Sequence, residues 1–235
     1  MARGDHYLIT CEHGGNRIPA RYRSLFTGFE DRLRSHRGYD PGALALARDL
    51  ASALSAPLHY STTSRLLIEL NRTIGHPKLY SDATRGAPAE VRKEILERHY
   101  LPYRNAAEAD IASAIAHGGR VIHVSSHSFT PELDGEVRNA DVGLLYDPAR
   151  AAEAELCRRW QARIETLAPE LKVRRNYPYT GKSDGFTAWL RRRFPADAYV
   201  GIELEINQKH VLSGGRRWRA LRGIVIEGLR QALAH

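Results

Sequence analysis

Short segments rich in β-branched and apolar residues alternate with longer amphipathic segments along almost the whole chain. The short segments predict strands, and the longer ones, with apolar residues every three or four positions, predict helices. We expect strands at residues 7–11, 65–70, 120–127, 141–146 and 199–206. We expect helices at about 40–54, at 88–117 with a break or kink near Pro102, and at 148–168 and 216–234. Strands separated by helices of this length indicate an α/β fold with a largely parallel or mixed sheet.

The composition is that of a folded protein. Of 235 residues, 43% are hydrophobic and 26% are charged, which excludes intrinsic disorder and collagen-like repeats and suits one domain. No apolar run approaches the roughly 20 residues of a membrane span, and residues 1–15 lack the apolar core of a signal peptide. Two cysteines, Cys11 and Cys157, rule out a disulfide framework and indicate a reducing compartment. We therefore expect a soluble, cytoplasmic domain that does not bind membranes.

The chain is basic, with 35 Lys and Arg against 27 Asp and Glu and a formal net charge of +8. Such a charge can serve nucleic-acid binding by neutralising phosphates. Here, however, the arginines are scattered among acidic residues, and no aromatic residues interleave with the densest runs, 191–193 and 216–217. An anionic small molecule fits the sign of the charge equally well, because a positive field concentrates it. We expect a small anionic substrate and no nucleic acid.

Acidic residues and histidines occur where the predicted elements begin or end. Glu12 and His13 follow the first strand, Asp40 precedes a helix, and His127 ends the strand at 120–127. The segment 69–72 places a glutamate, an asparagine and an arginine at the end of another strand. In open α/β sheets the ligand crevice lies outside the carboxyl ends of the strands. These side chains, far apart in sequence, are therefore expected to converge.

Glu203 and Glu205 lie two residues apart inside an otherwise apolar strand. Residues two apart on a strand point to the same face, so both carboxylates face one side of the sheet. Two carboxylates facing a core would cost several kcal/mol unless they are paired, metal-bound or solvated. The pattern fits either an edge strand with one solvated face or a cleft that contains a carboxylate general base.

His13 and His127 are candidate metal ligands. Two histidines and one carboxylate, with a fourth position left for water, form a standard catalytic zinc site. No compact HExxH segment is present, so the ligands would come from distant segments. Asp40 is either the carboxylate ligand or the N-cap of the helix that Pro41 opens, and one side chain can do both. Glu69 is the alternative ligand, or an acceptor that orients a ligating histidine.

Arg72 follows Asn71 directly after the predicted strand at 65–70. A guanidinium group can form a bidentate pair with a carboxylate. On an open surface Arg72 would have no special role. Beside a cleft it would clamp the carboxylate of a substrate.

Residues 181–185 match the pattern G-x-S-x-G, which places a nucleophilic serine at Ser183. That motif requires a buried strand before the turn, and the preceding segment contains a proline and no apolar run. The only downstream partners would be Asp197 and His210, which crowd close behind it. A serine hydrolase is therefore disfavoured, and a Cys11 nucleophile is weaker still.

Six segments occur in an order that characterises one family. They are CEHGGNRIP (11–19), YDPGALALA (39–47), RLLIELNR (65–72), HVSSHSF (123–129), NYPYTGKSDG (176–185) and GIELEINQ (201–208). Together they resemble the N-formylglutamate amidohydrolase family over nearly the whole chain. The resemblance implies a single amidohydrolase domain, residues 1–235, built as a three-layer α/β/α sandwich similar to zinc carboxypeptidases and zinc-dependent cell-wall amidases. It also implies metal-dependent hydrolysis of an N-formyl or N-acyl amino acid, first of all N-formylglutamate, and a place in histidine degradation.

The resemblance further implies roles for single residues. Three would bind Zn²⁺ or another divalent ion: His13, Asp40 and His127. Two would support them, with Glu69 orienting His13 and with a supporting or purely structural role for His123. Four would contact the carboxylate of the substrate: Asn71, Arg72, Asn16 and Lys182. Two are candidates for the general base that takes a proton from water and returns it to the leaving amine: Glu205, the first choice, and Glu203.

Two positions depart from the pattern of the family. Many relatives carry an aspartate where this chain has Glu69, and an arginine where it has Asn207. The first change moves the carboxylate by one methylene group, and the second removes a contact for an anion. The alternative to an enzyme is a binding or scaffold protein that keeps the fold without the metal.

Overall fold

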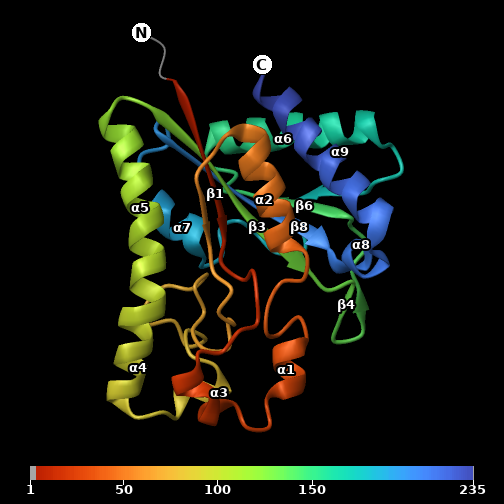
Figure 1. Ribbon diagram of the computed structural model, residues 1–235. Coiled ribbons are helices and arrows are strands. Elements are labelled where there is room, and N and C mark those ends of the chain that lie inside the picture. The colour runs from red at the N-terminus through yellow and green to blue at the C-terminus, as the bar shows by residue number, and fades with distance from the viewer. Residues whose placement is uncertain (1–3, 235) are drawn as a thin grey trace.

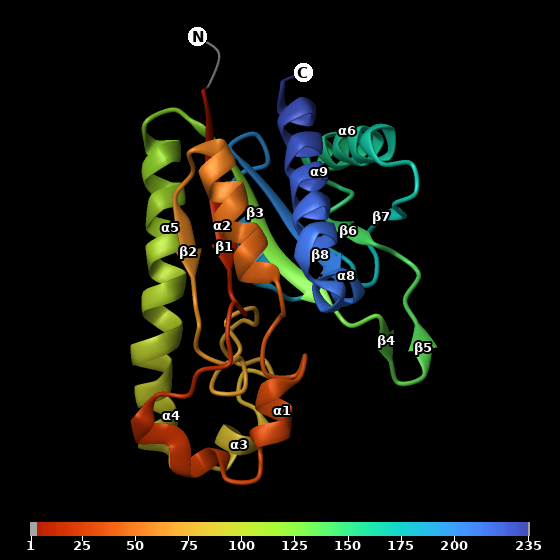
Figure 2. The ribbon, with the colours of Figure 1, turned by 45° about the vertical axis from the view of Figure 1, so that its right-hand side comes forward.

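Six strands form one mixed sheet in the order β2-β1-β3-β8-β6-β7 (Figures 1 and 2). The computed structural model describes residues 4–234, so residues 1–3 and 235 of the predicted domain lie outside the described range. The strands are β1 Asp5–Cys11, β2 Leu58–Tyr60, β3 Arg120–Phe129, β6 Val142–Leu145, β7 Val173–Arg175 and β8 Tyr199–Asn207. Strands β2, β1, β3 and β8 are parallel to one another. Strand β6 runs antiparallel to β8, and β7 runs parallel to β6.

Helices cover both faces of the sheet, which confirms the α/β/α sandwich (Figures 1 and 2). One face carries α2 Ala43–Leu54, α6 Ala151–Leu167 and α9 Gly215–Leu233, with α8 Gln208–Ser213 beside α9. The other face carries α5 Leu101–Ala116 and α7 Phe186–Arg191. Because side chains alternate along a strand, neighbouring residues serve different layers. Ile9 packs in the cluster under α2, α6 and α9, whereas Leu8 packs against α5 and α7.

The segments that follow β1 and β2 form a separate cap at the carboxyl ends of the parallel strands (Figure 2). Its elements are the 3₁₀ helix η1 Ala20–Phe26, α1 Glu30–Arg34, α3 Asp82–Arg85, α4 Ala89–Ile95 and the π-helical turn η2 Leu96–Tyr100. A third apolar cluster, which includes Tyr22, Phe26, Leu67 and Ile68, holds the cap together. A small hairpin, β4 Glu132–Leu133 and β5 Glu136–Val137, projects beyond the end of β3.

The strand expected at 65–70 is wrong, because these residues form consecutive turns. The amide of Leu67 donates to the carbonyl of Ser64 at 2.9 Å, and the amide of Arg72 donates to Glu69 at 3.2 Å. Leu67 and Ile68 are both fully buried although they are neighbours, so the apolar run fills the cap instead of alternating between two faces. A short apolar run does not distinguish these two outcomes by its periodicity.

The expected N-cap at Asp40 is also wrong. Helix α2 begins at Ala43, after Gly42, which has a φ of 83° and makes no side-chain cap. Glycine adopts this left-handed conformation without a steric penalty, and a Cβ atom here would lie 2.5 Å from Val211. Residues 40–42 therefore stand before the helix as a turn, and the carboxylate of Asp40 is free for other partners.

The helical region expected at 88–117 is present as α4, η2 and α5 in succession. The deviation from regular α-helix lies in the π-helical turn Leu96–Tyr100, just before Pro102. Proline has no amide hydrogen to donate within a helix, and a π turn is a known way to accommodate such an interruption. The two three-residue strands, β2 and β7, were not predicted.

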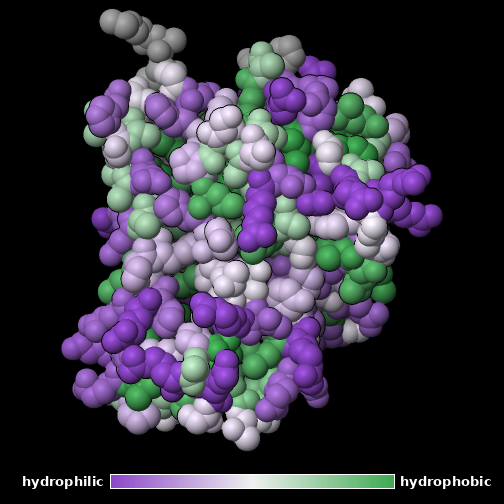
Figure 3. All heavy atoms as spheres, viewed as in Figure 1, coloured by the Kyte–Doolittle hydropathy of each residue, from purple (hydrophilic) through white to green (hydrophobic). Residues whose placement is uncertain are grey.

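The arginines of the densest basic run, 191–193, do not share one surface. Arg191 is buried and bonds to Glu153 at 2.9 Å, whereas Arg193 pairs with Glu108, so the run 191–193 is divided. On the face shown in Figure 3, apolar residues occur in small areas between hydrophilic ones. In the described part of the chain, no helix is long and apolar enough to cross a membrane.

Candidate active site

A cavity of about 390 Å³ lies where β1, β3 and β8 end beneath the cap. Its walls contain eight of the predicted site residues: His13, Asp40, Glu69, Asn71, Arg72, His127, Glu203 and Glu205. These residues come from the ends of three strands, the turn before α2 and the turns at 64–72. The structure therefore brings together segments that are distant in sequence, at the carboxyl edge of the sheet.

His13, Asp40 and His127 meet in the wall of this cavity. The Nδ1 atoms of His13 and His127 lie 3.2 and 2.9 Å from the same oxygen, Oδ2 of Asp40. One ligand atom from each residue can be chosen so that all three lie within 4.8 Å of one another, and all three side chains are buried. Two imidazole nitrogens and one carboxylate oxygen at this spacing form a suitable set for a divalent ion such as zinc.

A second carboxylate lies behind each histidine. Nε2 of His13 contacts Oε1 of Glu69, while Nε2 of His127 lies 3.1 Å from Oε2 of Glu12 and 2.8 Å from the hydroxyl of Ser125. Such partners hold the imidazole ring in place and leave Nδ1 directed at the cavity. Glu69 thus contacts His13, the residue that it was expected to orient. The role of Glu12 was not predicted, although its position next to His13 at the end of the first strand was a usable signal.

The carboxylates of this cluster favour positive charge on the histidines. Burial alone would lower the pKa of His127, but hydrogen bonds with Asp40 and Glu12 outweigh it and hold the pKa well above its usual range. Burial alone would raise the pKa of Asp40, but His13, His127 and Arg65 hold it far below. Asp40 therefore stays ionised beside two imidazole rings. A divalent cation bound here would displace the protons of these rings.

Arg65 links the two carboxylates on either side of His13. Its Nη1 atom lies 3.2 Å from Oδ1 of Asp40, and its Nη2 atom lies 2.6 Å from Oε2 of Glu69. The contact with Oδ1 leaves Oδ2 of Asp40 for the histidines. A role for Arg65 was not predictable from the sequence, because it depends on the turns at 64–72 that bring the guanidinium group back toward the cavity.

The two glutamates of β8 have different surroundings. Oε1 of Glu203 accepts a hydrogen bond from the hydroxyl of Thr187 at 2.6 Å. Glu205 is 5% exposed, and its Oε2 is buried without a hydrogen-bond partner in the described part of the chain. Strand register places Glu205 directly beside His127, and on its other side Gly143 offers no side chain. Burial, reinforced by Asp40 and Glu203 and only partly opposed by His127, raises the pKa of Glu205 to about 8.

This raised pKa predicts a pH-dependent cost in stability when no metal is bound. The folded state holds the proton on Glu205 more tightly than the unfolded chain does, so stability is lost as pH rises from about 4.5 toward about 8. We expect Glu205→Gln to unfold like the wild type at pH 5 after treatment with chelator. At pH 8.5 the variant should be more stable by on the order of 1–3 kcal/mol in urea unfolding. If the variant and the wild type were equally stable at pH 8.5 as well as at pH 5, the raised pKa of Glu205 would be contradicted.

Asn71 and Arg72 also line the cavity. Oδ1 of Asn71 accepts a hydrogen bond from the amide of Phe186 at 2.6 Å, which joins the 64–72 turns to α7. Nη1 of Arg72 donates to the backbone carbonyls of Asp184 and Asn71. No acidic side chain pairs with Arg72 within residues 4–234. Its guanidinium charge is therefore available to an anion in the cavity.

The family model for N-formylglutamate amidohydrolase matches residues 6–212 of this chain. The chain belongs to the N-formylglutamate amidohydrolase family. A solved gene product of Agrobacterium tumefaciens is 31% identical, with 97% of this chain and 90% of that chain covered and a TM-score of 0.83. An N-formylglutamate amidohydrolase from Ralstonia eutropha JMP134 is 18% identical, with 98% and 94% covered and a TM-score of 0.69, and shares the fold. The comparison with curated proteins found no match.

In this member of the N-formylglutamate amidohydrolase family, three predicted residues lie outside the cavity wall. Asn16 donates to the carbonyl of Leu33 at 3.0 Å, and the ammonium group of Lys182 faces Asp147 at 3.8 Å. His123 is buried between Thr10 and Tyr199, and burial lowers its pKa to about 4. Its neutral ring is held inside the sheet layer and does not line the cavity.

Asn207, one of the two positions at which the sequence was expected to depart from the family pattern, is fully buried. Its amide nitrogen donates to the carbonyls of Arg138 and Ala140, and its oxygen accepts from the amide of Lys209 at 3.0 Å. These bonds join the hairpin segment to the start of α8. In this chain the position ties backbone segments together and does not line the cavity.

The alternative nucleophiles of the sequence lack the partners they need. Ser183 lines the cavity, but its hydroxyl contacts Thr180 at 3.1 Å, whereas His210 pairs with Asp141 at 2.7 Å. Cys11 is fully buried, and burial raises the pKa of its thiol well above its usual range. Neither residue meets a general base in the described part of the chain.

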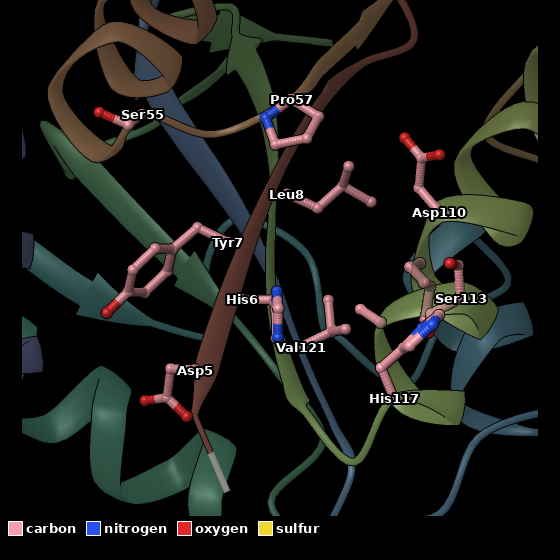
Figure 4. A pocket seen from close by; sticks show the side chains of 12 residues that line it. Asp5, His6, Tyr7, Leu8, Ser55, Pro57, Asp110, Ser113, His117 and Val121 are labelled. Atoms are coloured by element: carbon pink, nitrogen blue, oxygen red, sulfur yellow. The ribbon is translucent and has the colours of Figure 1, made fainter.

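A larger cavity, about 480 Å³, lies at the other end of β1 (Figure 4). Its lining comes mainly from Asp5–Leu8 of β1, from α5, which includes Asp110, and from His117 at the end of that helix. It contains none of the predicted site residues. Volume alone therefore does not locate the chemistry, and the cavity at the carboxyl edge is the candidate active site.

Proposed function

We propose that this chain is a zinc-dependent amidohydrolase that cleaves the linear amide of an N-formyl amino acid, N-formylglutamate first, to give formate and the free amino acid. Membership of the N-formylglutamate amidohydrolase family supports amide hydrolysis. The single observation that carries the metal-dependent form is the meeting of two Nδ1 atoms and one carboxylate oxygen on a buried wall. We also propose that the protein is located in the cytoplasm, as expected for an enzyme that acts on a small metabolite and has no disulfide framework.

The residues present fit a divalent ion. His13, Asp40 and His127 would hold it, while Glu69 and Glu12 would fix the two rings from behind. When bound, zinc would activate a water molecule and polarise the carbonyl of the scissile amide. The unpartnered oxygen of Glu205 in the same wall is the feature that such a site requires of its base.

Glu205 is the proposed carrier of the proton. Its free Oε2 accepts a proton from the attacking water and delivers it to the amide nitrogen as the carbon–nitrogen bond breaks. Glu203 is a weaker candidate, because the hydroxyl of Thr187 already donates to its Oε1. Glu205 is largely shielded from bulk solvent, so the proton it takes from the attacking water passes to the leaving amine within the cavity.

Arg72 is the proposed anchor for the carboxylate of the substrate. We expect Arg72→Ala to raise KM for N-formylglutamate by about 10–100-fold with a smaller change in kcat, because one charge-assisted bidentate contact is lost. Steady-state kinetics measures this directly. Arg48→Ala, which removes an arginine that stacks on Tyr60 away from the cavity, is the control. An unchanged KM in Arg72→Ala would dismiss the clamp.

The test of the proposed function is a hydrolysis screen across N-formyl and N-acetyl amino acids, with formate or acetate measured and with zinc present. Metal content of the purified protein is determined in parallel. About one zinc per chain and release of formate from N-formylglutamate would support the proposal. A protein that binds no divalent ion and hydrolyses none of these amides would instead be a binding or scaffold protein on this fold.

A further inference from the structure

Another cavity, about 430 Å³, adjoins the candidate active site. Four residues belong to the walls of both: Arg65, Glu69, Lys78 and Leu133. Beyond these residues the adjoining cavity, here called the basic groove, is formed by α1 and the residues after it, by the segment leading into α3, and by the tip of the β4–β5 hairpin. The site therefore continues past the metal ligands, between the cap and the hairpin.

Positive charge exceeds negative charge in the basic groove. Its cations are Arg32, Arg37, Arg65, Lys78 and Arg85, and its acids are Glu69, Asp82 and Asp134. Arg65 pairs with Glu69, while Arg32 and Arg85 share Asp82. Within the described chain, the side-chain charges of Arg37 and Lys78 have no ion-pair partner. Two unpaired cations therefore line the groove, Lys78 at the shared wall and Arg37 beyond it, and within the described chain they face one acid without an ion pair, Asp134.

Cavities of roughly 300–1,000 Å³ enclose drug-sized ligands. The candidate active site and the basic groove together fall in this range, so they offer more room than a formylated amino acid needs. We propose that the basic groove binds a second carboxylate at the far end of the substrate's side chain, beyond the length of glutamate. This inference rests on the proposed function, because the position of the scissile amide sets the direction in which the side chain of the substrate runs. The substrate class is an N-acyl amino acid whose side chain is extended by a further acidic unit.

The assignment follows the order of the cations. With the α-carboxylate on Arg72 and the amide at His13 and His127, the side chain of the substrate runs past Lys78. A carboxylate at the length of glutamate reaches only the shared wall. One that is longer by a glycine unit enters the basic groove, where Arg37 is the remaining unpaired cation.

The test uses two substrates of equal shape, N-formyl-γ-L-glutamylglycine and N-formyl-γ-L-glutamylglycinamide, which differ in the terminal charge. We expect the zinc-loaded enzyme to favour the acid by about tenfold in kcat/KM. Arg37→Gln should remove most of this preference. Arg85→Gln removes the same charge from the same cavity but from a residue that is paired with Asp82 at 3.0 Å, and it should keep the preference. No preference in the wild type, or equal losses in both variants, would overturn the proposal.

A binding measurement separates this inference from the proposed function. Calorimetry with chelator-treated protein compares γ-L-glutamylglycine with γ-L-glutamylglycinamide, neither of which carries the scissile formyl group. Tighter binding of the acid that is lost in Arg37→Gln supports the groove even if no formyl substrate is hydrolysed. Hydrolysis of both formyl substrates with equal kcat/KM and equal binding of both probes would overturn the groove and leave the proposed function standing.

Discussion

Glu205→Gln is expected to lower kcat by about 10²–10⁴-fold, the usual contribution of a general base. Glutamine keeps the size of the side chain but cannot accept the proton of water. The buried Oε2 of Glu205 has no hydrogen-bond partner in the described structure, so the substitution breaks no contact of that atom. The proposed metal ligands are other residues, so the zinc content should stay at the wild-type value. Formate release and elemental analysis of the same preparation measure both quantities.

Glu203→Gln is the matched control, because the residue lies on the same face of the same strand. The hydroxyl of Thr187 can still bond to the amide oxygen of the new side chain, and we expect kcat to fall by less than about tenfold, well below the loss of a general base. Equal losses in the two variants would mean that neither glutamate acts alone as the base. A Glu205→Gln variant that keeps at least half of the wild-type rate would exclude Glu205.

The long elements of the fold were predictable from the sequence because each carries a strong local pattern. Strands β3 and β8 are buried along almost their whole length, as expected for central strands covered on both faces, and their positions agree with the prediction. The segment 65–70 is also a short, largely apolar run, yet it packs into the cap, because no strand of the described chain pairs with it. Strands β2 and β7 contain three residues each, too few to show a period.

Only those site residues could be predicted that lie near the ends of strands or within the family motifs. His13, His127 and Glu205 follow or end strands, and parallel topology then brings them to one edge. Asp40 could not be separated from a helix cap by sequence, because the start of the helix depends on the left-handed backbone of Gly42. The ion pairs of Arg65 depend on the path of the turns, which has no periodic signature.

Asp40→Asn is expected to remove stoichiometric zinc and, with it, nearly all activity. The amide is neutral, so the two Nδ1 atoms and Arg65 lose the anion that lies between them. Residues behind metal ligands usually contribute about 10–100-fold to affinity, and a direct ligand should contribute more. We therefore expect an increase in the zinc dissociation constant of more than about 100-fold, measured by competition with a chromogenic chelator.

Glu12→Gln provides the graded comparison, because Glu12 touches the same cluster only through Nε2 of His127 at 3.1 Å. Its loss of zinc affinity should stay within about 10–100-fold, and excess zinc should restore activity. Zinc should also raise the thermal midpoint of the wild type and of Glu12→Gln but not that of Asp40→Asn, since a ligand stabilises the folded state only in proportion to its occupancy. If Asp40→Asn bound zinc as tightly as Glu12→Gln, Asp40 would only hold the histidines in place, and the carboxylate ligand would have to be sought elsewhere in the wall, at Glu69 first.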